Sequence, residues 1–345
     1  LVNAMIDGDA SIHTYQNSNG IQYGTCSEQL ANDFLEILFK CGLSPTISRF
    51  RKGNQFVVNC CMSRGGMPRV KKSHIKQTRY KGKVWCFTTS TGYFVTMRNG
   101  RIGIQGNSGK ILQVTQEMEY VGKEILDGFM LNQSLLNGEM PGYCHSDDTL
   151  TLTDSGFKHY DEIDENDKIG CYNPNTQTLE YHSYLQKHVY DFNGDLINFK
   201  TDKIDILVTP NHRMYVQPRG HTEFKFIEAK DVALRAKTIS SINNFLGNDL
   251  SDVKISDTLS IPIRNYCKLV GLYVSEGCTA SEKRINRKNQ ITTLSICQSI
   301  NGKARDAIKE VYKDTFNTHY ETSTSVSVYK PELAQHFSLY YGNHS

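Results

Sequence analysis

The order of strand-rich and helix-rich segments is the feature that most constrains the fold of this chain. Residues 79–107 and 144–262 contain short runs of Val, Ile, Thr, Tyr and Phe separated by turn residues, which is typical of β-strands. Residues 108–143 lie between them and have no strand signal, so they predict a helical segment. Neither strand-rich segment is expected to close a β-domain alone, and we therefore expect the two to assemble with each other.

Local patterns predict the individual elements. Residues 30–43 carry apolar side chains at helical spacing, which predicts a helix, and residues 302–316 repeat the pattern. Residues 46–62 and the basic stretch 280–299 predict strands. Turns are expected at residues 91–92, 99–100, 154–156, 173–175 and 193–194. The fold class predicted is therefore mixed, in the order α/β, β, helical linker, β, α/β.

Composition excludes several classes of protein. The chain has 345 residues with 38% hydrophobic and 22% charged content, which is typical of a globular protein with two or three domains. No apolar run approaches the roughly 20 residues that a membrane span needs, so we expect no membrane partner. The ten cysteines include no C-x-x-C pair, which favours free thiols in a reducing cytoplasm. Leu1 and Ser345 are interpreted as cut edges of a longer sequence.

Two decapeptides, residues 1–10 and 268–277, share one plan. Each has an apolar run followed by an acid at the ninth place, Asp9 in the first and Glu276 in the second. Each also has small residues four positions apart, which lie on one helix face and let two helices approach closely. These small residues are Ala4, Gly8, Gly271 and Ser275. Paired helices of this kind would bring two carboxylates together, where Mg²⁺ could bind and activate water for phosphodiester hydrolysis.

The two decapeptides resemble the paired motifs of LAGLIDADG homing endonucleases. This resemblance implies an αββαββα half-repeat around each motif, with sheets that contact the major groove of double-stranded DNA. Asp9 and Glu276 match the metal-binding, catalytic acids of the family, whereas Asp7 has Val274 as its counterpart and is given no role. The sequence departs from the family where Asn3 and Ala4 replace the usual small residues and where Glu replaces Asp at 276. The implied enzyme is a monomer with two pseudo-symmetric halves.

A second set of residues resembles the splicing blocks of inteins, which have the hedgehog/intein β-fold. Cys144 opens the second strand-rich segment, and Thr209 and His212 follow 65 and 68 positions later. Cys86 lies in the first strand-rich segment, which ends in Asn107 and Ser108. Each of these residues matches a position in the splicing blocks of inteins. The catalytic residues that the resemblance implies are therefore Cys144, Thr209, His212, Cys86, Asn107 and Ser108.

The chemistry implied by this resemblance explains the residue types. The Cys144 thiol would attack the carbonyl of Tyr143 and form a thioester, with His212 protonating the departing amine and Thr209 holding the peptide. The Ser108 hydroxyl would then attack the thioester, assisted by Cys86. The side-chain amide of Asn107 would attack its own backbone carbonyl, forming a succinimide and cutting the chain. No cofactor is expected for these steps.

The sequence departs from the commonest intein pattern at two places. Gly106 stands before Asn107 where the family usually has His, and Tyr93 occupies another position that is often His. Both histidines usually assist the cyclisation of Asn, so C-terminal cleavage would be slow or would use other groups.

The implied parts stand in reversed order. The five segments are a C-terminal endonuclease half at 1–78, a C-terminal splicing segment at 79–107, a host-protein (extein) segment at 108–143, an N-terminal splicing segment at 144–262 and an N-terminal endonuclease half at 263–345. Either the chain runs from the end of one intein into the start of a second, or it is a permuted intein whose halves assemble. In the permuted case, ligation of Tyr143 to Ser108 would release residues 108–143 as a cyclic peptide.

Other functions remain open from the sequence alone. Residues 108–143 weakly resemble phage portal or head proteins, so the chain could be a structural phage protein that carries inactive intein pieces. A free-standing DNA endonuclease would not need Cys144, Asn107 or Ser108, and a hedgehog-type autoprocessing domain has no reason to end in Asn followed by a hydroxyl nucleophile. We expect the chain to act in the cytoplasm of a microbial or phage-infected cell.

Overall fold

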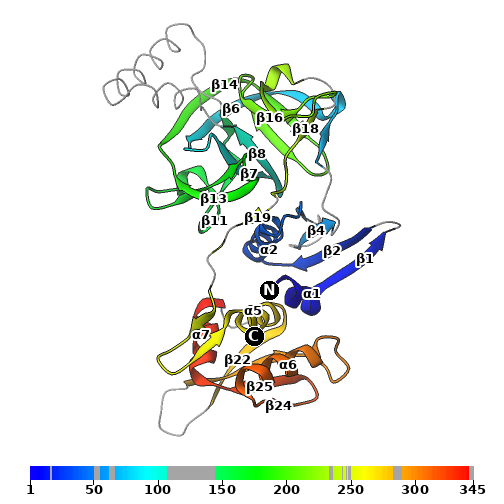
Figure 1. Cartoon of the computed structure of the whole chain (residues 1–345), viewed down its shortest axis with the longest axis vertical. Helices are drawn as coiled ribbons and strands as arrows, with labels where there is room; N and C mark the ends of the chain where they lie inside the picture. Colours follow the sequence, from blue (N-terminus) through cyan, green and yellow to red (C-terminus); the bar gives the residue numbers. More distant parts are fainter. Residues whose placement is uncertain are drawn as a thin grey trace. The chain divides into compact units, whose positions relative to one another are not determined.

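The computed structural model describes the chain in several stretches. These are residues 1–15, 18–49, 55–61, 67–106, 144–232, 236–242, 244–245, 247, 250–282 and 290–341, with the side chains of residues 8, 9, 14, 15, 18, 244 and 282 outside the description. The fold is mixed, with many strands and few helices in the described part (Figure 1). No helix among these residues has the length and apolar content needed to cross a bilayer.

The chain forms two compact units. We call Tyr15–Gly20 and Thr25–Leu246 the central unit, and Leu1–Thr14, Ile21–Gly24 and Gly247–Ser345 the terminal unit. This division differs from the predicted segments because residues 25–78 cluster with the central unit. The physical reason is that β3 (Thr46–Arg49) hydrogen-bonds to β8 (Arg101–Gly106), which extends the central sheet into the first 78 residues.

A closed barrel in the central unit joins the two strand-rich segments. Its longest strands, β6 (Ile75–Thr88) and β14 (Gln186–Lys200), pair antiparallel along the whole 14-residue length of β6 (Figure 1). The barrel is completed by β15 (Asp205–Val208) and β9 (His145–Ser146). Strands on either side of residues 108–143 therefore form one barrel, which is the assembly that the sequence predicts.

A large sheet makes a second connection between the strand-rich segments, because β7 (Tyr93–Arg98) pairs with β10 (Leu150–Thr153). The other strands of this sheet in the central unit are β3, β8, β4 (Phe56–Cys61), β11 (Gly156–His159), β12 (Lys168–Asn173), β13 (Thr178–Ser183) and β19 (Asn244–Phe245). Helix α2 (Glu28–Lys40) packs against β3, β4 and β11. The predicted helix at 30–43 and the predicted strands at 46–62 are confirmed, although residues 50–54 and 62 lie outside the described part.

A four-stranded sheet also contains residues from both sides of residues 108–143. Its order is β17 (Lys225–Glu228), β16 (Arg213–Gln217), β18 (Ala236–Thr238) and β5 (Arg69–Val70). Its inward side chains, among them Val70, Met214 and Ala236, belong to one buried apolar cluster with Phe199 and Val208 of the barrel. Short 3-10 turns lie at Lys72–His74, Tyr160–Glu162 and Ala229–Asp231.

Four of the five predicted turns are confirmed and one is wrong. Asn99 and Gly100 take positive φ angles of 49° and 67° and close the β7–β8 hairpin, as the Asn-Gly pattern predicts. Turns also separate β6 from β7, β10 from β11 and β12 from β13. The turn predicted at 193–194 is absent because β14 continues through it, with Asn193 opposite Lys81 and Gly194 opposite Tyr80. A long partner strand thus overrides the local turn preference of Asn-Gly.

A buried carboxylate fastens the β7–β8 hairpin to the barrel. The fully buried side chain of Asp205 accepts hydrogen bonds from Asn99 and Asn198, each at 3.0 Å, and forms an ion pair with Arg98 at 2.5 Å. Burial favours the neutral acid, but the hydrogen bonds from Asn99 and Asn198 and the charges of Arg98 and Lys200 outweigh it and lower the pKa of Asp205. Its charge is therefore compensated within the fold.

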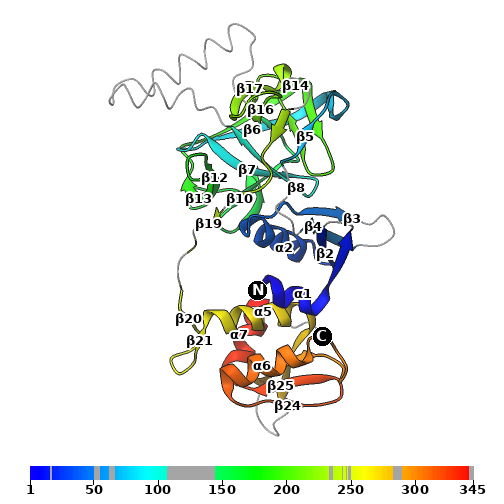
Figure 2. The same cartoon turned by 45° about the vertical axis from the view of Figure 1, so that its right-hand side comes forward.

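The terminal unit contains two packed helices, α1 (Val2–Asp9) and α5 (Ile263–Glu276), which lie side by side in both views (Figures 1 and 2). After α5 come β22 (Gly277–Glu282), β23 (Gln290–Cys297), α6 (Arg305–Phe316), β24 (Tyr320–Glu321), β25 (Ser325–Tyr329) and α7 (Pro331–Tyr341). The predicted helix at 302–316 is thus confirmed. A hairpin of β20 (Asp252–Lys254) and β21 (Ser260–Pro262) contacts α5, so this unit begins before residue 263.

The order of elements repeats along the chain. From α5 onward it is α, β, β, α, β, β, α, and the first 61 residues run α1, β1 (Ala10–Tyr15), β2 (Ser18–Thr25), α2, β3, β4. The first six elements of each stretch are therefore the same in type and order. The stretch from α5 has all seven elements of the order αββαββα that the resemblance to LAGLIDADG proteins implies, whereas the first stretch has six, with β5 as the next described element after β4.

Candidate functional site

Cys144 is held by a reciprocal pair of hydrogen bonds at the edge of the barrel. Its backbone N–H donates to the hydroxyl of Thr209 at 3.1 Å, and the N–H of Thr209 donates to the Cys144 carbonyl at 3.0 Å. Because Thr209 directly follows β15 and Cys144 directly precedes β9, the pairing of Val208 with His145 brings them together. The hydroxyl of Thr209 therefore contacts the nitrogen of the peptide bond that precedes Cys144.

A tight turn after β15 brings His212 beside this pair. The N–H of His212 donates to the Thr209 carbonyl at 3.0 Å, and the N–H of Ala229 donates to the His212 carbonyl at 2.8 Å. The side chains of Thr209 and His212 are both fully buried. The ring of His212 meets the ring of His145 edge to face, with centroids 4.5 Å apart. The structure thus brings Cys144, Thr209 and His212 together.

Cys86 lies on β6, where the barrel closes on β9. Its neighbour Trp85 pairs with His145, and both thiols, Cys86 and Cys144, are fully buried in one apolar cluster. Burial raises the pKa of the Cys144 thiol well above its ordinary value, and the neighbouring Cys86 adds to the effect. The Cys144 thiol is therefore protonated at neutral pH, and its attack on a carbonyl requires a group that takes the proton.

His145 is a candidate functional residue that the sequence reasoning missed. It is fully buried, and neither ring nitrogen has a hydrogen-bond partner among the described residues. Burial, followed by the nearby His212, lowers the pKa of His145 well below its ordinary value, so the ring is neutral at pH 7. The sequence signal that could have identified it is its position directly after Cys144. Side chains alternate between the two faces of a strand, and the His145 ring lies on the face where it packs against Trp85.

The other junction is described up to Gly106, the last residue of β8. A Cβ at this position would lie 2.7 Å from the carbonyl oxygen of Arg213 and 2.4 Å from the ring of Phe226, so the backbone of Gly106 packs directly on the residue after His212. Asn107, Ser108 and Tyr143 lie outside the described residues. The close approach still places the strand that leads to Asn107 beside the Thr209–His212 turn.

Tyr93 lies opposite Gly106 in the β7–β8 hairpin. Its ring packs against Tyr215 and Phe226, with centroid distances of 4.8 and 5.0 Å. Burial raises the pKa of the Tyr93 hydroxyl, so it remains protonated at neutral pH. An aromatic cluster therefore surrounds Tyr93, and its protonated hydroxyl is not a base at neutral pH.

The predicted helix pairing in the terminal unit is present. A Cβ at Gly271 would lie 2.7 Å from the Cβ of Ala4 and 2.9 Å from the carbonyl oxygen of Leu1, so these small residues let α1 and α5 approach closely. Asp9 ends α1, with its side chain outside the description, and Glu276 ends α5 with its side chain half-buried. The described residues contain no group of three or more candidate metal ligands, so Mg²⁺ binding remains a prediction.

Comparisons with known proteins give little further information. No family model matches the chain, and no solved structure is similar to it. A stretch of 92 residues is 32% identical to an ATP-dependent Clp protease proteolytic subunit of Chlamydomonas moewusii. The match covers 26% of this chain, and the chain spans only 9% of the length of that relative. Similarity over so small a part of both proteins leaves the family of this chain open.

Proposed function

We propose that the central unit is the splicing domain of an intein with the hedgehog/intein fold, and that it cuts the chain on both sides of residues 108–143. The observation that carries this proposal is the contact between the Cys144 N–H and the Thr209 hydroxyl, with His212 in the same turn. The close packing of Gly106 on Arg213 supports it further, because it brings the last described residue before Asn107 close to that turn.

In the first step, the Cys144 sulfur attacks the carbonyl carbon of Tyr143. A carbon–sulfur bond forms, the carbon–nitrogen bond breaks, and the thiol proton ends on the freed amine of Cys144. His212 is the group that passes this proton, because its backbone is fixed one turn from Thr209. His145 acts through His212 as a positioning residue. The two imidazole rings are in contact, so two positive charges there would repel each other.

In the second step, the Ser108 hydroxyl attacks the thioester and releases the Cys144 thiol, with Cys86 assisting the proton transfer. The side-chain amide nitrogen of Asn107 then attacks its own backbone carbonyl, which forms a succinimide and frees the amine of Ser108. That amine displaces the ester oxygen, leaving an amide bond between Tyr143 and Ser108. Because both splicing segments belong to one chain, the product is a cyclic peptide of residues 108–143.

The proposed first step can be tested by thiol-induced cleavage. A purified chain that carries Asn107→Ala and Ser108→Ala can neither cyclise Asn nor pass the acyl group to a hydroxyl, so added dithiothreitol should cleave only the thioester and yield fragments 1–143 and 144–345. Cys144→Ala should abolish this cleavage, whereas Cys171→Ala, which removes another buried thiol of the same unit, should not. Equal cleavage of the chains with and without the Cys144 thiol would contradict the mechanism, and so would the absence of cleavage in the parent chain. The second result would favour the alternative function, a structural protein that carries inactive intein pieces.

For the terminal unit we propose descent from a LAGLIDADG endonuclease that cuts double-stranded DNA with Mg²⁺. Support comes from the contact of Ala4 with Gly271 and from the repeated element order. Bound Mg²⁺ would supply an activated water, and Asp9 and Glu276 are the residues that would hold it. Selection of cleaved duplexes from a randomised library with Mg²⁺ tests this. Glu276→Gln should abolish cleavage, whereas Glu310→Gln on the exposed side of α6 should leave it unchanged.

A further inference from the structure

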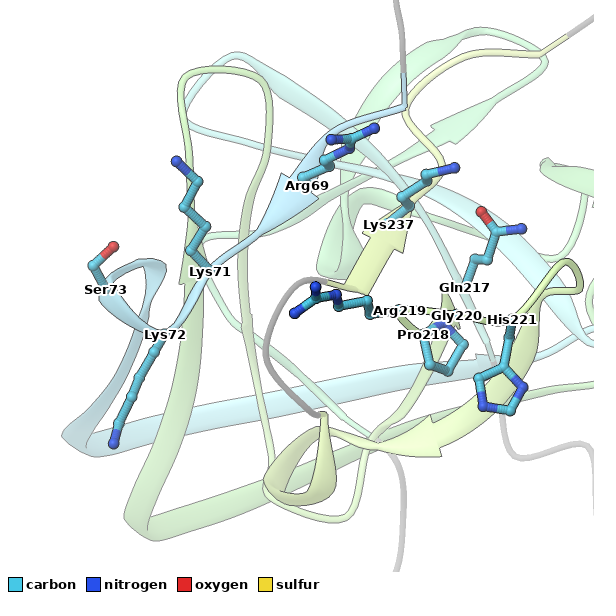
Figure 3. Close-up of a pocket in the computed structure, with 10 residues that line it drawn as sticks. All are labelled: Arg69, Lys71, Lys72, Ser73, Gln217, Pro218, Arg219, Gly220, His221 and Lys237. Atoms are coloured by element: carbon cyan, nitrogen blue, oxygen red, sulfur yellow. The ribbon is translucent and has the colours of Figure 1, made fainter.

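A basic hollow of about 680 Å³ lies on the central unit, and none of the residues that line it is assigned to splicing (Figure 3). Its lining includes five Lys or Arg side chains and neither Asp nor Glu. These five are Arg69, Lys71, Lys72, Arg219 and Lys237. Such a concentration of one charge is local, because the whole chain has a net charge of only +3.

The centre of the hollow is a row of side chains across three strands. Gln217 on β16 is the cross-strand neighbour of Lys237 on β18, and Lys237 is in turn the neighbour of Arg69 on β5. Their sequence neighbours Val70 and Ala236 point into the core and fix the strands. Adjacent strands lie about 4.8 Å apart, so the row presents closely and regularly spaced donors.

Lys237 and Arg69 form a like-charge pair directly opposite each other, an arrangement that destabilises a sheet. In the part of the chain that the structure describes, none of the five cationic side chains forms an ion pair with a carboxylate. Four of the five are exposed, and Lys237 is half-buried. The fold therefore holds concentrated positive charge without a compensating acid.

The charged ends fan out and do not converge on one point. Figure 3 shows Arg69 and Lys237 on one side of the hollow, Lys71 and Lys72 pointing away from them, and Arg219 between the two pairs. A single small anion can contact few of these groups at once. An extended polyanion with regularly spaced charges can contact most of them.

We propose that this hollow binds the phosphate backbone of duplex DNA. Arg69 and Lys237 contact phosphates from the rigid sheet, and Arg219, Lys71 and Lys72 extend the contact along the backbone. The side-chain amide of Gln217 donates one N–H to the Thr222 carbonyl and offers its second N–H as a neutral donor. Lys and Arg contacts of this kind are independent of base sequence and release counterions, so the binding weakens steeply with salt. The central unit thereby has its own contact with nucleic acid, independent of whether the chain splices.

The test is the salt dependence of binding to a fluorescein-labelled duplex of random sequence, measured by anisotropy in EDTA. The full chain carries Cys144→Ala and Asn107→Ala so that it stays intact. Arg69→Gln/Lys237→Gln removes two phosphate contacts and should reduce the slope of log K against log salt by about 2. The control, Lys81→Gln/Lys168→Gln, removes two exposed lysines outside the hollow and should leave the slope unchanged.

The melting temperature of the Arg69→Gln/Lys237→Gln variant serves as the control for folding. It should equal or exceed that of the parent chain, because the substitutions remove a like-charge pair, and the reduced slope then reports binding and not unfolding. Equal slopes for the two double variants would overturn the proposal. Displacement of the duplex by inorganic pyrophosphate, added at an equal concentration of phosphate groups, would also overturn the proposal. That result would indicate a site for one small anion. Failure of splicing would leave this binding measurement unaffected, so the two outcomes are distinguishable.

Discussion

The Thr209 hydroxyl provides the sharpest test of the proposed junction chemistry. It accepts a hydrogen bond from the Cys144 N–H at 3.1 Å, and that nitrogen is the leaving group of the first step. Thr209→Val keeps the branched shape of the side chain and the backbone pairing with the Cys144 carbonyl but removes the acceptor. The substitution therefore acts on one contact with the reacting peptide bond.

The expected magnitude follows from the charge that develops on the nitrogen. In the ground state the bond is between neutral groups and contributes about 1 kcal/mol, whereas a bond from a positively charged nitrogen contributes about 1.5–3 kcal/mol. The bond therefore strengthens by about 0.5–2 kcal/mol in the transition state, which accelerates the step by about 2- to 30-fold. Thr209→Val should slow thioester formation by that factor.

The assay is the initial rate of dithiothreitol-induced cleavage between Tyr143 and Cys144 in the chain that carries Asn107→Ala and Ser108→Ala, followed by intact mass. The matched control is Thr151→Val, because the fully buried Thr151 hydroxyl donates to the Val95 carbonyl at 2.9 Å in the same unit. Each variant loses about 1 kcal/mol of stability from one buried hydrogen bond. Equal cleavage rates for Thr209→Val and Thr151→Val would refute the role of the hydroxyl in the reaction.

Three further predictions concern packing and charge in the central unit. Gly106→Ala should lower stability by about 1–3 kcal/mol and stop cleavage at Asn107, since its Cβ would overlap Phe226; melting temperature and mass spectrometry check this. Asp205→Asn should cost about 1–3 kcal/mol in urea unfolding, because the buried charge-assisted bonds are weakened and Arg98 keeps only Asp148 as an ionic partner. The lowered pKa of His145 means that stability should be full above pH 6.5 and fall below it; His145→Leu should remove this dependence.

Elements governed by local chemistry could be predicted from the sequence. The Asn99–Gly100 hairpin follows from the preference of this dipeptide for positive φ angles, and α2 follows from apolar spacing and a Ser27 cap. The contact of Ala4 with Gly271 followed from small residues at matching places in two decapeptides. The proximity of Cys144 to Thr209 and His212 was implied by the resemblance to inteins, because no local pattern relates residues 65 positions apart.

Features that depend on long-range pairing could not be predicted. Gly194 lies inside β14 because β6 offers a partner along its whole length, and nothing near Gly194 in the sequence reveals that partner. His145 gained its position beside His212 through the pairing of β9 with β15 and β6. The like-charge pair of Arg69 and Lys237 depends on a register between strands that are more than 160 residues apart, so it was also hidden from sequence reasoning.

The most direct measurement is the intact mass of the freshly purified, unmodified chain over time. If the Cys144 thiol and the Asn107 amide act in one splicing domain, residues 108–143 should appear as a peptide one water lighter than its linear form. Fragments 1–107 and 144–345 should accumulate with it, and Cys144→Ala should prevent the cyclic product. A folded chain that keeps its full mass, or that releases residues 108–143 only as a linear peptide, would contradict the account.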